Sequence, residues 1–284
     1  MSAVALMNGR LCESLPLGDR GFAYGDGLFE TVRVVDGQGL LWEYHLKRLV
    51  SGCERLRIPL PDDLESNLPV WLRRLLNTTQ SRDPSFRADD FILKIVVTRG
   101  SGGRGYRPLA TGVEPSIYLS LHAVPSDLKE KQQNGISAKL LDYRLVSHPV
   151  LAGLKHLNRL DQVLASLELR DEDEGLLLNQ AGFLIEGTKS NLLLYVNDEF
   201  VTPELHGCGV EGVMRQWLIA PDNPAGIQVN VAPVKSDVLQ TAKGLAVINS
   251  VMGVCPVSSL NGLEWVVPEQ LRHLQHAVHS QLRF

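Results

Sequence analysis

Lys155 is the residue whose surroundings point most directly to covalent chemistry. It follows Ala152-Gly153-Leu154, and leucines at helical spacing begin just after it, so its amine has a partly apolar setting. Burial lowers the pKa of an amine, and a neutral lysine can act as a nucleophile and as a base. Lys94 is the main competitor because it interrupts the apolar run of an expected strand, although it could instead line a polar face or extend from an edge. Most lysines are exposed, so position alone does not decide between the two.

Glu186 is the second residue with chemical potential. It ends the strand-like run Gly182-Phe183-Leu184-Ile185, and Gly187-Thr188-Lys189-Ser190-Asn191 follows it. A carboxylate among apolar neighbours needs a cationic partner or a proton. The segment therefore predicts either a buried carboxylate that pairs with a cationic group or an ordinary turn with Glu186 exposed.

A glycine-rich loop, Gly100-Ser101-Gly102-Gly103-Arg104-Gly105, fits the Gly-x-Gly-x-x-Gly pattern of dinucleotide-binding proteins. That pattern requires a helix to begin at the third glycine, whereas Pro108 biases Arg107 away from helical geometry. The dinucleotide interpretation therefore fails. The loop and its approach instead carry groups suited to a carboxylate ligand, because guanidinium groups offer paired donors: Arg99, Arg104, Tyr106 and Arg107. A solvated loop between strands is the alternative.

The composition is that of an ordinary globular protein of 284 residues with a net charge of −4. This charge gives no reason to expect nucleic acid or an anionic membrane as a partner. No apolar run approaches the roughly 20 residues that a membrane helix needs. The stretch Met1 to Arg10 also lacks the features of a secretory signal. We expect a cytoplasmic protein.

Neither the cysteines nor the histidines predict a metal site. The cysteines are scattered without a Cys-x-x-Cys pair, which favours buried free thiols: Cys12, Cys53, Cys208 and Cys255. Three histidines share helical spacing near the C-terminus, but no carboxylate or cysteine joins them. A solvated helix face is the better interpretation for His273, His276 and His279.

The elements that must position these residues alternate between strands and helices. In the first half, Asn8-Gly9 and Asp36-Gly37 are turn signals. Strands are expected at 3–7, 28–35, 91–98 and 117–123, and helices at 42–56 and 64–76. In the second half, strands are expected at 136–145, 175–178, 191–196 and 245–251, and helices at 157–169 and from Pro268 onward.

Pro125-Ser126-Asp127 and the charged, non-periodic stretch to Asn134 form the best candidate linker. Strands and helices are mixed on both sides of it. The sequence therefore predicts an α+β protein with a small N-terminal domain (1–122), a linker (123–134) and a larger C-terminal domain (135–284).

Five stretches, taken together and in order, resemble the class IV aminotransferase family, which is the fold-type IV group of pyridoxal-phosphate enzymes. The family includes branched-chain and D-amino-acid aminotransferases and 4-amino-4-deoxychorismate lyase. Each stretch is weak alone, but five in the family's order over nearly the whole chain are specific. They are Tyr24-Gly25-Asp26-Gly27-Leu28-Phe29-Glu30-Thr31, His45-Leu46-Lys47-Arg48-Leu49, Lys155-His156-Leu157-Asn158-Arg159-Leu160, Glu186-Gly187-Thr188-Lys189-Ser190-Asn191 and Gly209-Val210-Glu211-Gly212-Val213-Met214-Arg215.

The resemblance implies a two-domain fold like that of D-amino-acid aminotransferase, with an active site between the domains and pyridoxal 5'-phosphate as cofactor. Lys155 matches the lysine that holds the cofactor as a Schiff base. Glu186 matches the carboxylate that binds the pyridine nitrogen, and Arg48 matches the phosphate-binding arginine. A protonated pyridine nitrogen is the cation that a buried Glu186 would need.

Further cofactor contacts are implied by the same resemblance. Val213 and Met214 match the residues at a helix start whose backbone N–H groups hold the phosphate, which requires no particular side chain. Val210 matches the residue packed against one face of the cofactor. Asn249 and Ser250 fall where the family places a second phosphate-binding turn, with a looser match.

Within the family, the segments Arg99 to Tyr106 and Lys155 to Leu164 look like those of the lyases. Glu186-Gly187-Thr188 departs from the pattern of branched-chain aminotransferases. The resemblance therefore implies conversion of 4-amino-4-deoxychorismate to 4-aminobenzoate and pyruvate for folate synthesis, with Lys155 as base and acid and Thr31 assisting. A D-amino-acid or branched-chain aminotransferase is the alternative. A homodimer acting on a small molecule is also implied, and the retention of Lys155, Glu186 and Arg48 argues against a catalytically silent relative.

Overall fold

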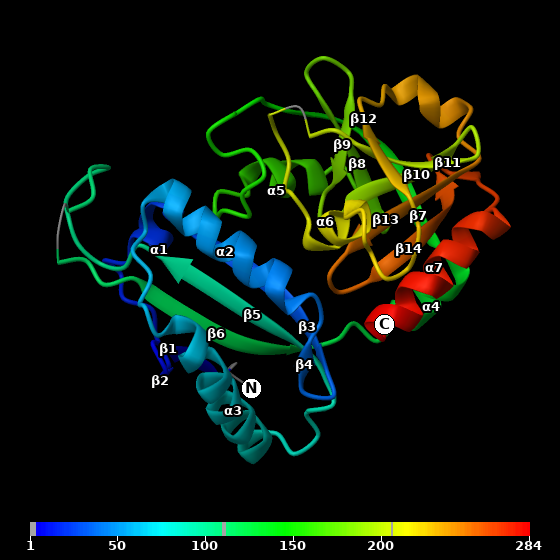
Figure 1. The fold of residues 1–284 in the computed structure, drawn as a ribbon. Helices are drawn as coiled ribbons and strands as arrows, with labels where there is room; N and C mark the ends of the chain where they lie inside the picture. The colour runs from blue at the N-terminus through cyan, green and yellow to red at the C-terminus, as the bar shows by residue number, and fades with distance from the viewer. Residues whose placement is uncertain (1–3, 110–111, 206) are drawn as a thin grey trace. The chain divides into compact units, whose positions relative to one another are not determined.

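A computed structural model describes residues 4–109, 112–205 and 207–284, and it divides the chain into two compact units. The first unit contains Met1–Val124 and the short segment Lys155–Asn158, and the second contains Pro125–Leu154 and Arg159–Phe284. Both units combine helices with sheets (Figure 1). The predicted α+β class is confirmed.

Within its described residues, the first unit has a six-stranded sheet in the order β2-β1-β6-β5-β3-β4, with every neighbouring pair antiparallel. The strands are β1 (Ala5–Met7), β2 (Arg10–Cys12), β3 (Gly27–Val35), β4 (Gln38–Gly39), β5 (Asp90–Thr98) and β6 (Ser116–Ala123). The helices are α1 (Arg20–Tyr24), α2 (Trp42–Leu56) and α3 (Leu64–Arg82).

The two faces of this sheet differ because side chains alternate along each strand. On one face, Leu28, Val32 and Val34 of β3 are buried, and they lie in register with the buried Val97, Leu93 and Phe91 of β5. The other face carries Phe29 and Thr31 of β3 and Lys94 of β5, all at least partly exposed. The central strands therefore pack apolar side chains into the core on one face of the sheet and carry polar and aromatic side chains on the other face.

The second unit has, among its described residues, a nine-stranded sheet in the order β12-β11-β10-β13-β14-β7-β8-β9, with β15 paired to β14. Its strands are β7 (Ile136–Leu145), β8 (Glu174–Asn179), β9 (Leu184–Gly187), β10 (Asn191–Val196), β11 (Glu199–Pro203), β12 (Val229–Ala232), β13 (Gly244–Asn249), β14 (Gly253–Leu260) and β15 (Leu263–Glu264). The α-helices are α4 (Leu128–Asn134), α5 (Leu160–Ser166), α6 (Val213–Ile219) and α7 (Glu269–Leu282), and Ser236–Gln240 forms a 3₁₀ turn.

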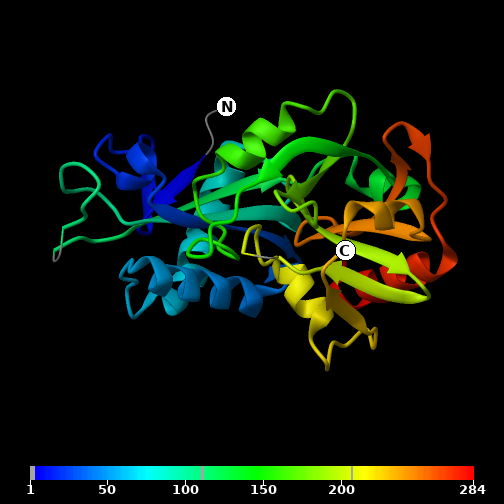
Figure 2. The same ribbon diagram turned by 90° about the horizontal axis from the view of Figure 1, so that it is seen from above.

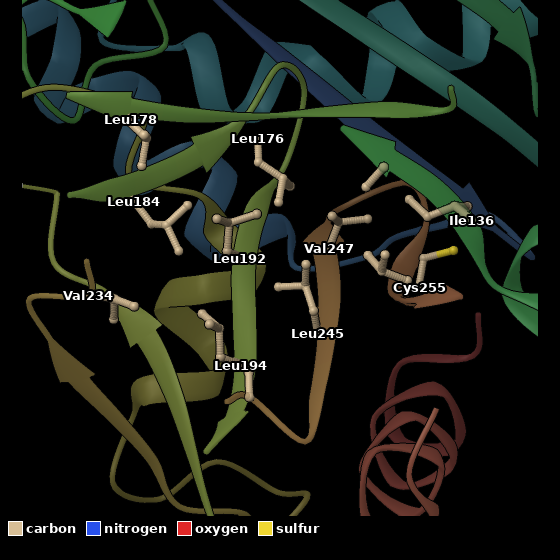
Figure 3. Packing of buried hydrophobic residues seen from close by; sticks show 13 residues of the cluster. Ile136, Leu176, Leu178, Leu184, Leu192, Leu194, Val234, Leu245, Val247 and Cys255 are labelled. Atoms are coloured by element: carbon tan, nitrogen blue, oxygen red, sulfur yellow. The ribbon is translucent and has the colours of Figure 1, made fainter. Parts of the chain in front are cut away.

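The core of the second unit is built from aliphatic side chains of β8, β9, β10, β13 and β14 (Figure 3). Leu192 and Leu194 of β10 point into it alongside Leu245 and Val247 of β13, as strand pairing places them. Near-continuous burial explains why β8 and β10 have leucine runs without alternation. This core fixes the ends of β9 and β13, where candidate site residues lie.

Several sequence predictions match the structure closely. The helix at 42–56 and the strand at 136–145 have the predicted bounds, and Asn8-Gly9 joins β1 to β2; Ala3 lies outside the described residues. Helix α3 runs on to Arg82 with Pro69 inside it. Cys53, Cys208 and Cys255 are buried free thiols as predicted, and Cys12 is partly exposed. Burial raises the pKa of Cys53 and Cys255 to about 12 and that of Cys208 to about 11.

Three expectations require correction. The stretch to Asn134 contains helix α4. Leu128 is the one buried side chain of this helix, so its sequence has no repeating apolar pattern. Helix α5 begins at Leu160 and not at Leu157, because the segment before it pairs with β3. On α7, His273 and His276 are exposed, but His279 is only partly exposed, and its Nε2 accepts a hydrogen bond from the Val254 N–H at 3.0 Å. No helix among the described residues is long and apolar enough to cross a membrane.

Candidate active site

Lys155 is held against the first unit by backbone pairing. Its carbonyl accepts a hydrogen bond from the Phe29 N–H at 2.9 Å, and the Leu157 N–H donates to the Gly27 carbonyl at 2.9 Å. The Nζ atom lies 4.5 Å from the centroid of the Phe29 ring. The segment that carries Lys155 therefore extends the start of β3, and its amine sits over an aromatic face.

Lys94, the competing lysine, lies on the open face of the same sheet. It is paired with Thr31 across β3 and β5, and its Nζ atom lies 5.4 Å from the centroid of the Phe29 ring. Lys94 is exposed, whereas Lys155 is partly buried. Two ammonium groups therefore flank one aromatic ring, with the hydroxyl-bearing Thr31 on the strand between them.

Arg48 is fixed by a buried carboxylate. Its Nε donates to Glu30 Oε1 at 2.8 Å and its Nη2 to Glu30 Oε2 at 2.5 Å, while His45 Nδ1 lies 2.6 Å from Glu30 Oε2. Burial alone would raise the Glu30 pKa, but the Arg48 charge and the hydrogen bonds from Arg48 and His45 outweigh it and lower the pKa to about 2. Glu30 is therefore ionised and anchors one edge of the Arg48 guanidinium.

His45 has a neutral ring in this cluster. Burial lowers its pKa against the opposing effect of Glu30, so Nδ1 carries the proton and donates it to the ionised Glu30. Its Nε2 is buried and finds no hydrogen-bond partner among the described residues. A buried polar atom without a protein partner is typical of a place that a bound group or water completes.

Glu186 ends β9 and is buried, with 3% of its surface exposed. Its Oε1 accepts a hydrogen bond from Gln162 Nε2 at 3.1 Å, and its Oε2 accepts one from the Val210 N–H at 2.7 Å. Gly209 must be glycine here, because its φ is +77° and an added Cβ would lie 2.7 Å from the Ile185 side chain. The burial of Glu186 excludes the exposed-turn alternative, and its pairing with a cationic group stays a prediction.

Gln162 was not identified from the sequence as a site residue. It lies on α5 and donates to Glu186, and its Oε1 is buried without a hydrogen-bond partner among the described residues. The donor side of the amide faces the carboxylate, which is the orientation that an ionised Glu186 favours. The only sequence signal was a glutamine beside a row of leucines on a predicted helix, which is unspecific.

Val213 and Met214 begin α6 and are buried, with Gly212 preceding the helix. The first N–H groups of a helix have no partner within it and carry partial positive charge. Asn191 fixes the approach, because its Nδ2 donates to the Val210 carbonyl at 3.0 Å. The helix start is therefore a rigid place for an anion to receive backbone hydrogen bonds.

Asn249 and Ser250 form the turn after β13. Asn249 Oδ1 accepts hydrogen bonds from the N–H groups of Val251 and Met252 at 2.9 and 2.8 Å, and its Nδ2 donates to the Lys189 carbonyl at 3.2 Å. The Asn249 side chain thus shapes the turn itself. Ser250 is buried, with 9% of its surface exposed.

Glu174 clamps the turn that follows Glu186, and it was also missed from the sequence. It is fully buried at the start of β8. Its Oε1 accepts hydrogen bonds from both the N–H and the Oγ1 hydroxyl of Thr188, and its Oε2 accepts one from the Ser190 hydroxyl. A lone carboxylate at a strand start carries no distinguishing sequence signal. Its contacts hold residues 187–190 against β8 and so fix the position of Glu186.

The glycine-rich loop protrudes beyond the ends of β5 and β6 in both views of the ribbon (Figure 1, Figure 2). Arg104, Tyr106 and Arg107 are exposed on it. Arg99, just before it, is engaged: Nε and Nη2 pair with Asp26 at 2.8 and 3.0 Å, and Nη1 and Nη2 donate to the Arg57 and Leu56 carbonyls. These contacts favour a structural role for Arg99 and leave Arg104 and Arg107 as the candidates for a ligand.

Comparison with known proteins identifies the relatives of this chain. Residues 27–260 match the amino-transferase class IV family. The chain belongs to this family. It is 34% identical over 276 residues to an aminodeoxychorismate lyase of Vibrio harveyi, covering 95% of this chain and 97% of that protein. It is 32% identical to a putative branched-chain-amino-acid aminotransferase of Methanocaldococcus jannaschii, covering 86% and 82%.

Solved structures of the class IV family have the same fold. The 4-amino-4-deoxychorismate lyase of Pseudomonas aeruginosa is 39% identical and superposes with a TM-score of 0.84, covering 99% of this chain and 100% of that one. The branched-chain aminotransferase of Escherichia coli, at 18% identity and a TM-score of 0.84, shares the fold alone. The fold-type IV prediction is confirmed.

Class IV aminotransferases depend on pyridoxal phosphate, and the residues of this chain fit that cofactor. In the first unit, Lys155 offers an amine and Arg48 a fixed guanidinium, and the buried His45 Nε2 has no hydrogen-bond partner within the part of the chain that the structure describes. In the second unit, Glu186 offers a buried carboxylate and Val213 begins a helix. Amine, cation, anion and helix start are the donor set that an aldehyde, a phosphate and a pyridine nitrogen require.

Proposed function

We propose that this chain is a cytoplasmic aminodeoxychorismate lyase, which converts 4-amino-4-deoxychorismate to 4-aminobenzoate and pyruvate for folate synthesis. The observation that carries the proposal is the 39% identity to the Pseudomonas aeruginosa lyase over 99% of this chain. The 34% identity to the Vibrio harveyi lyase supports it. Free buried cysteines suit a reducing compartment such as the cytoplasm.

In this proposal the cofactor is held by Lys155 and Glu186, with its phosphate on Arg48. Further contacts come from Val210, Val213, Met214, Asn249 and Ser250. When bound, pyridoxal phosphate supplies an electron-withdrawing ring that stabilises negative charge on the carbon bearing the substrate amine. Glu186, which is buried and accepts the Val210 N–H bond, would as a carboxylate hold the pyridine nitrogen in its protonated form.

Lys155 then carries the proton transfers. As a neutral amine it removes the proton from the amine-bearing ring carbon of the substrate, and as an ammonium it donates a proton to the departing enolpyruvyl group. Breaking that C–O bond makes the substrate ring aromatic and releases pyruvate. Thr31 lies in the same sheet face as Phe29, over which Lys155 sits, so its hydroxyl is a candidate to assist the second transfer.

The substrate carries two carboxylates, which need cationic partners. Arg104 and Arg107 present guanidinium groups from the exposed loop, and Lys94 presents an ammonium beside Phe29. Tyr106, with 86% of its surface exposed, adds a phenol to the same loop. The proposal therefore assigns the carboxylates to these side chains and leaves Arg99 to the structure of the loop base.

Arg104→Ala should raise the KM for 4-amino-4-deoxychorismate about thirtyfold and leave the cofactor absorbance unchanged. A hydrogen bond to a charged group contributes about 1.5–3 kcal/mol, and each 1.4 kcal/mol is tenfold in binding. Arg87→Ala is the matched control, because Arg87 is an exposed arginine of the same unit paired with Asp89. Steady-state kinetics on both variants measure the effect, and an unchanged KM in Arg104→Ala would remove Arg104 from substrate binding.

An aminotransferase is the competing function, supported by the 32% identity to the Methanocaldococcus jannaschii protein. Both reactions begin with the same proton removal by Lys155, so the cofactor contacts do not separate them. The decisive experiment supplies 4-amino-4-deoxychorismate and measures 4-aminobenzoate and pyruvate, with D-alanine or L-leucine plus 2-oxoglutarate in parallel. Transamination without 4-aminobenzoate would overturn the lyase and leave the family assignment intact.

We also infer a homodimer, from an apolar row on α5. Four exposed apolar side chains lie at i, i+3, i+4 and i+7 on α5 and at its C-terminal end, whereas Ala165 on the same helix is buried. They are Leu160 (73% exposed), Val163 (53%), Leu164 (49%) and Leu167 (75%), the last of which directly follows the helix. A contiguous apolar stripe turned to solvent marks a contact surface. A second copy of the chain is the partner that the family resemblance implies.

Leu164→Glu should dissociate this dimer, because it would bury an unpaired charge in an apolar contact. We expect the dimer dissociation constant to rise roughly a hundredfold or more. Light scattering after size-exclusion chromatography measures the mass. Leu263→Glu on β15 is the control, since Leu263 is a similarly exposed leucine outside α5 and should leave the mass unchanged. Equal masses for both variants would exclude α5 as the interface.

A further inference from the structure

The loop that carries Arg104 and Arg107 has little intrinsic order. Gly100, Gly103 and Gly105 adopt φ values of +83°, +81° and +69°, which favour glycine and leave the free chain very flexible. The loop protrudes from the sheet in both views (Figure 1, Figure 2). Fixing such a segment at the moment of binding would cost conformational entropy, so its arginines bind a ligand well only if the backbone is already fixed.

Arg20 holds both ends of this loop. It is buried, with 4% of its surface exposed, and its backbone N–H donates to the Gly100 carbonyl at 2.9 Å. Its guanidinium donates from Nη1 to the Gly105 carbonyl at 3.1 Å and from Nη2 to the Tyr106 carbonyl at 2.8 Å. The Arg20 backbone therefore holds the start of the loop, and its side chain binds the two consecutive carbonyls, of Gly105 and Tyr106, that lie between Arg104 and Arg107.

Arg20 is itself fixed by charge and by an aromatic contact. Its Nε pairs with Asp26 Oδ2 at 2.8 Å, and the same carboxylate binds Arg99. Burial would raise the Asp26 pKa, but hydrogen bonds from Arg99 and Arg20 outweigh it and lower the pKa, so the carboxylate is ionised. The Arg20 Cζ atom also lies 5.0 Å from the Tyr24 ring centroid, and that ring meets Tyr106 edge-on at 5.4 Å.

We propose that Arg20 is a positioning residue that fixes the 100–107 loop so that Arg104 and Arg107 are held ready for the substrate carboxylates. Arg20 does not contact the substrate, because its guanidinium donors are directed at Asp26, Gly105 and Tyr106. The inference rests on the proposed function for the identity of the anion. The anchoring itself stands on the contacts of the loop.

Arg20→Lys is the test variant, since lysine keeps a charge for Asp26 but has a single nitrogen and cannot span two loop carbonyls. Trypsin cleavage after Arg104, identified by fragment mass, measures loop order without any substrate. We expect the cleavage rate to rise about tenfold and the KM to rise about tenfold, as loss of one of the two charged hydrogen bonds to the loop carbonyls (about 1.4 kcal/mol) predicts. The kcat should stay within about twofold and the cofactor absorbance should be unchanged.

Arg33→Lys is the matched control, because Arg33 is a buried arginine of the same unit that pairs with Asp90 through Nε and Nη2 at 2.9 Å. It should leave both tryptic cleavage after Arg104 and KM unaltered. A general loss of stability would move both variants together and would appear in their thermal unfolding.

Unchanged cleavage in Arg20→Lys would overturn the anchoring, and faster cleavage with an unchanged KM would overturn the positioning role. Failure of the proposed function gives a different pattern. In that case the unaltered enzyme forms no 4-aminobenzoate, or Arg104→Ala leaves KM unchanged, while the trypsin comparison still reports on Arg20.

Discussion

Lys155→Ala should abolish 4-aminobenzoate formation, with kcat falling by at least about 10⁴-fold. General acid–base catalysis contributes 10²–10⁴-fold by itself, and Lys155 is proposed to act in two proton transfers and to hold the cofactor. The amine lies 4.5 Å from the Phe29 ring centroid, and backbone hydrogen bonds to β3 fix its segment. Alanine has a methyl group in place of the lysine side chain, so it can neither transfer a proton nor hold the cofactor.

Two measurements check this expectation. Steady-state kinetics give kcat, and the visible absorbance of the enzyme reconstituted with pyridoxal phosphate reports the covalent link to lysine. The matched variant is Lys94→Met, because Lys94 flanks the same Phe29 ring at 5.4 Å but is exposed. Lys94→Met should keep the absorbance band. Loss of the band in Lys94→Met and its survival in Lys155→Ala would reverse the assignment of the two lysines.

Local sequence patterns predicted those elements whose cause is local. Helix α2 was predicted with correct bounds because Leu46, Leu49 and Cys53 repeat at helical spacing and Pro59 prevents continuation. The strand predicted at 136–145 is β7, with the same bounds. In these cases the pattern along the chain and the burial in the fold have the same origin.

The start of α5 shows where local patterns fail. Leu157 continues the leucine spacing of the helix, yet its N–H donates to Gly27, about 130 residues earlier in the chain. Pairing with β3 withdraws Lys155–Asn158 from the helix and gives the lysine an extended backbone. A contact between distant segments overrides helix propensity, and no window of neighbouring residues contains that information.

The same limit applies to the site. The apolar neighbours of Glu186 left two interpretations open, a buried carboxylate or an exposed turn, and the structure shows that it is buried. The sequence could not distinguish structural arginines from ligand-binding ones, because the role of a guanidinium group depends on which carboxylate it pairs with in the folded protein. Arg99 and Arg20 share Asp26, and Arg48 binds Glu30, through pairings that only the folded sheet and helices create. Arg104 differs from these arginines because it is exposed, and the sequence does not show that difference.

Glu186→Gln should lower kcat about 10²- to 10³-fold while leaving the protein folded. Removing one preorganised electrostatic group from an active site typically has this effect, and each tenfold corresponds to 1.36 kcal/mol. Glutamine has the same shape and can still accept the Val210 N–H bond, but it is neutral. It therefore cannot keep a pyridine nitrogen protonated, and the ring would lose its capacity to stabilise charge.

The folded state should tolerate this substitution because of Gln162. An introduced amide would face the Nε2 donor of Gln162, but Gln162 can rotate and offer its Oε1, which has no hydrogen-bond partner among the described residues. The thermal midpoint should therefore shift by only a few degrees, whereas kcat falls. Glu168→Gln is the control, since Glu168 is a carboxylate of the same unit that accepts the Asp142 and Tyr143 N–H bonds and should leave kcat within about twofold. Equal kcat values for Glu186→Gln and Glu168→Gln would mean that the carboxylate charge at Glu186 does not take part in the reaction.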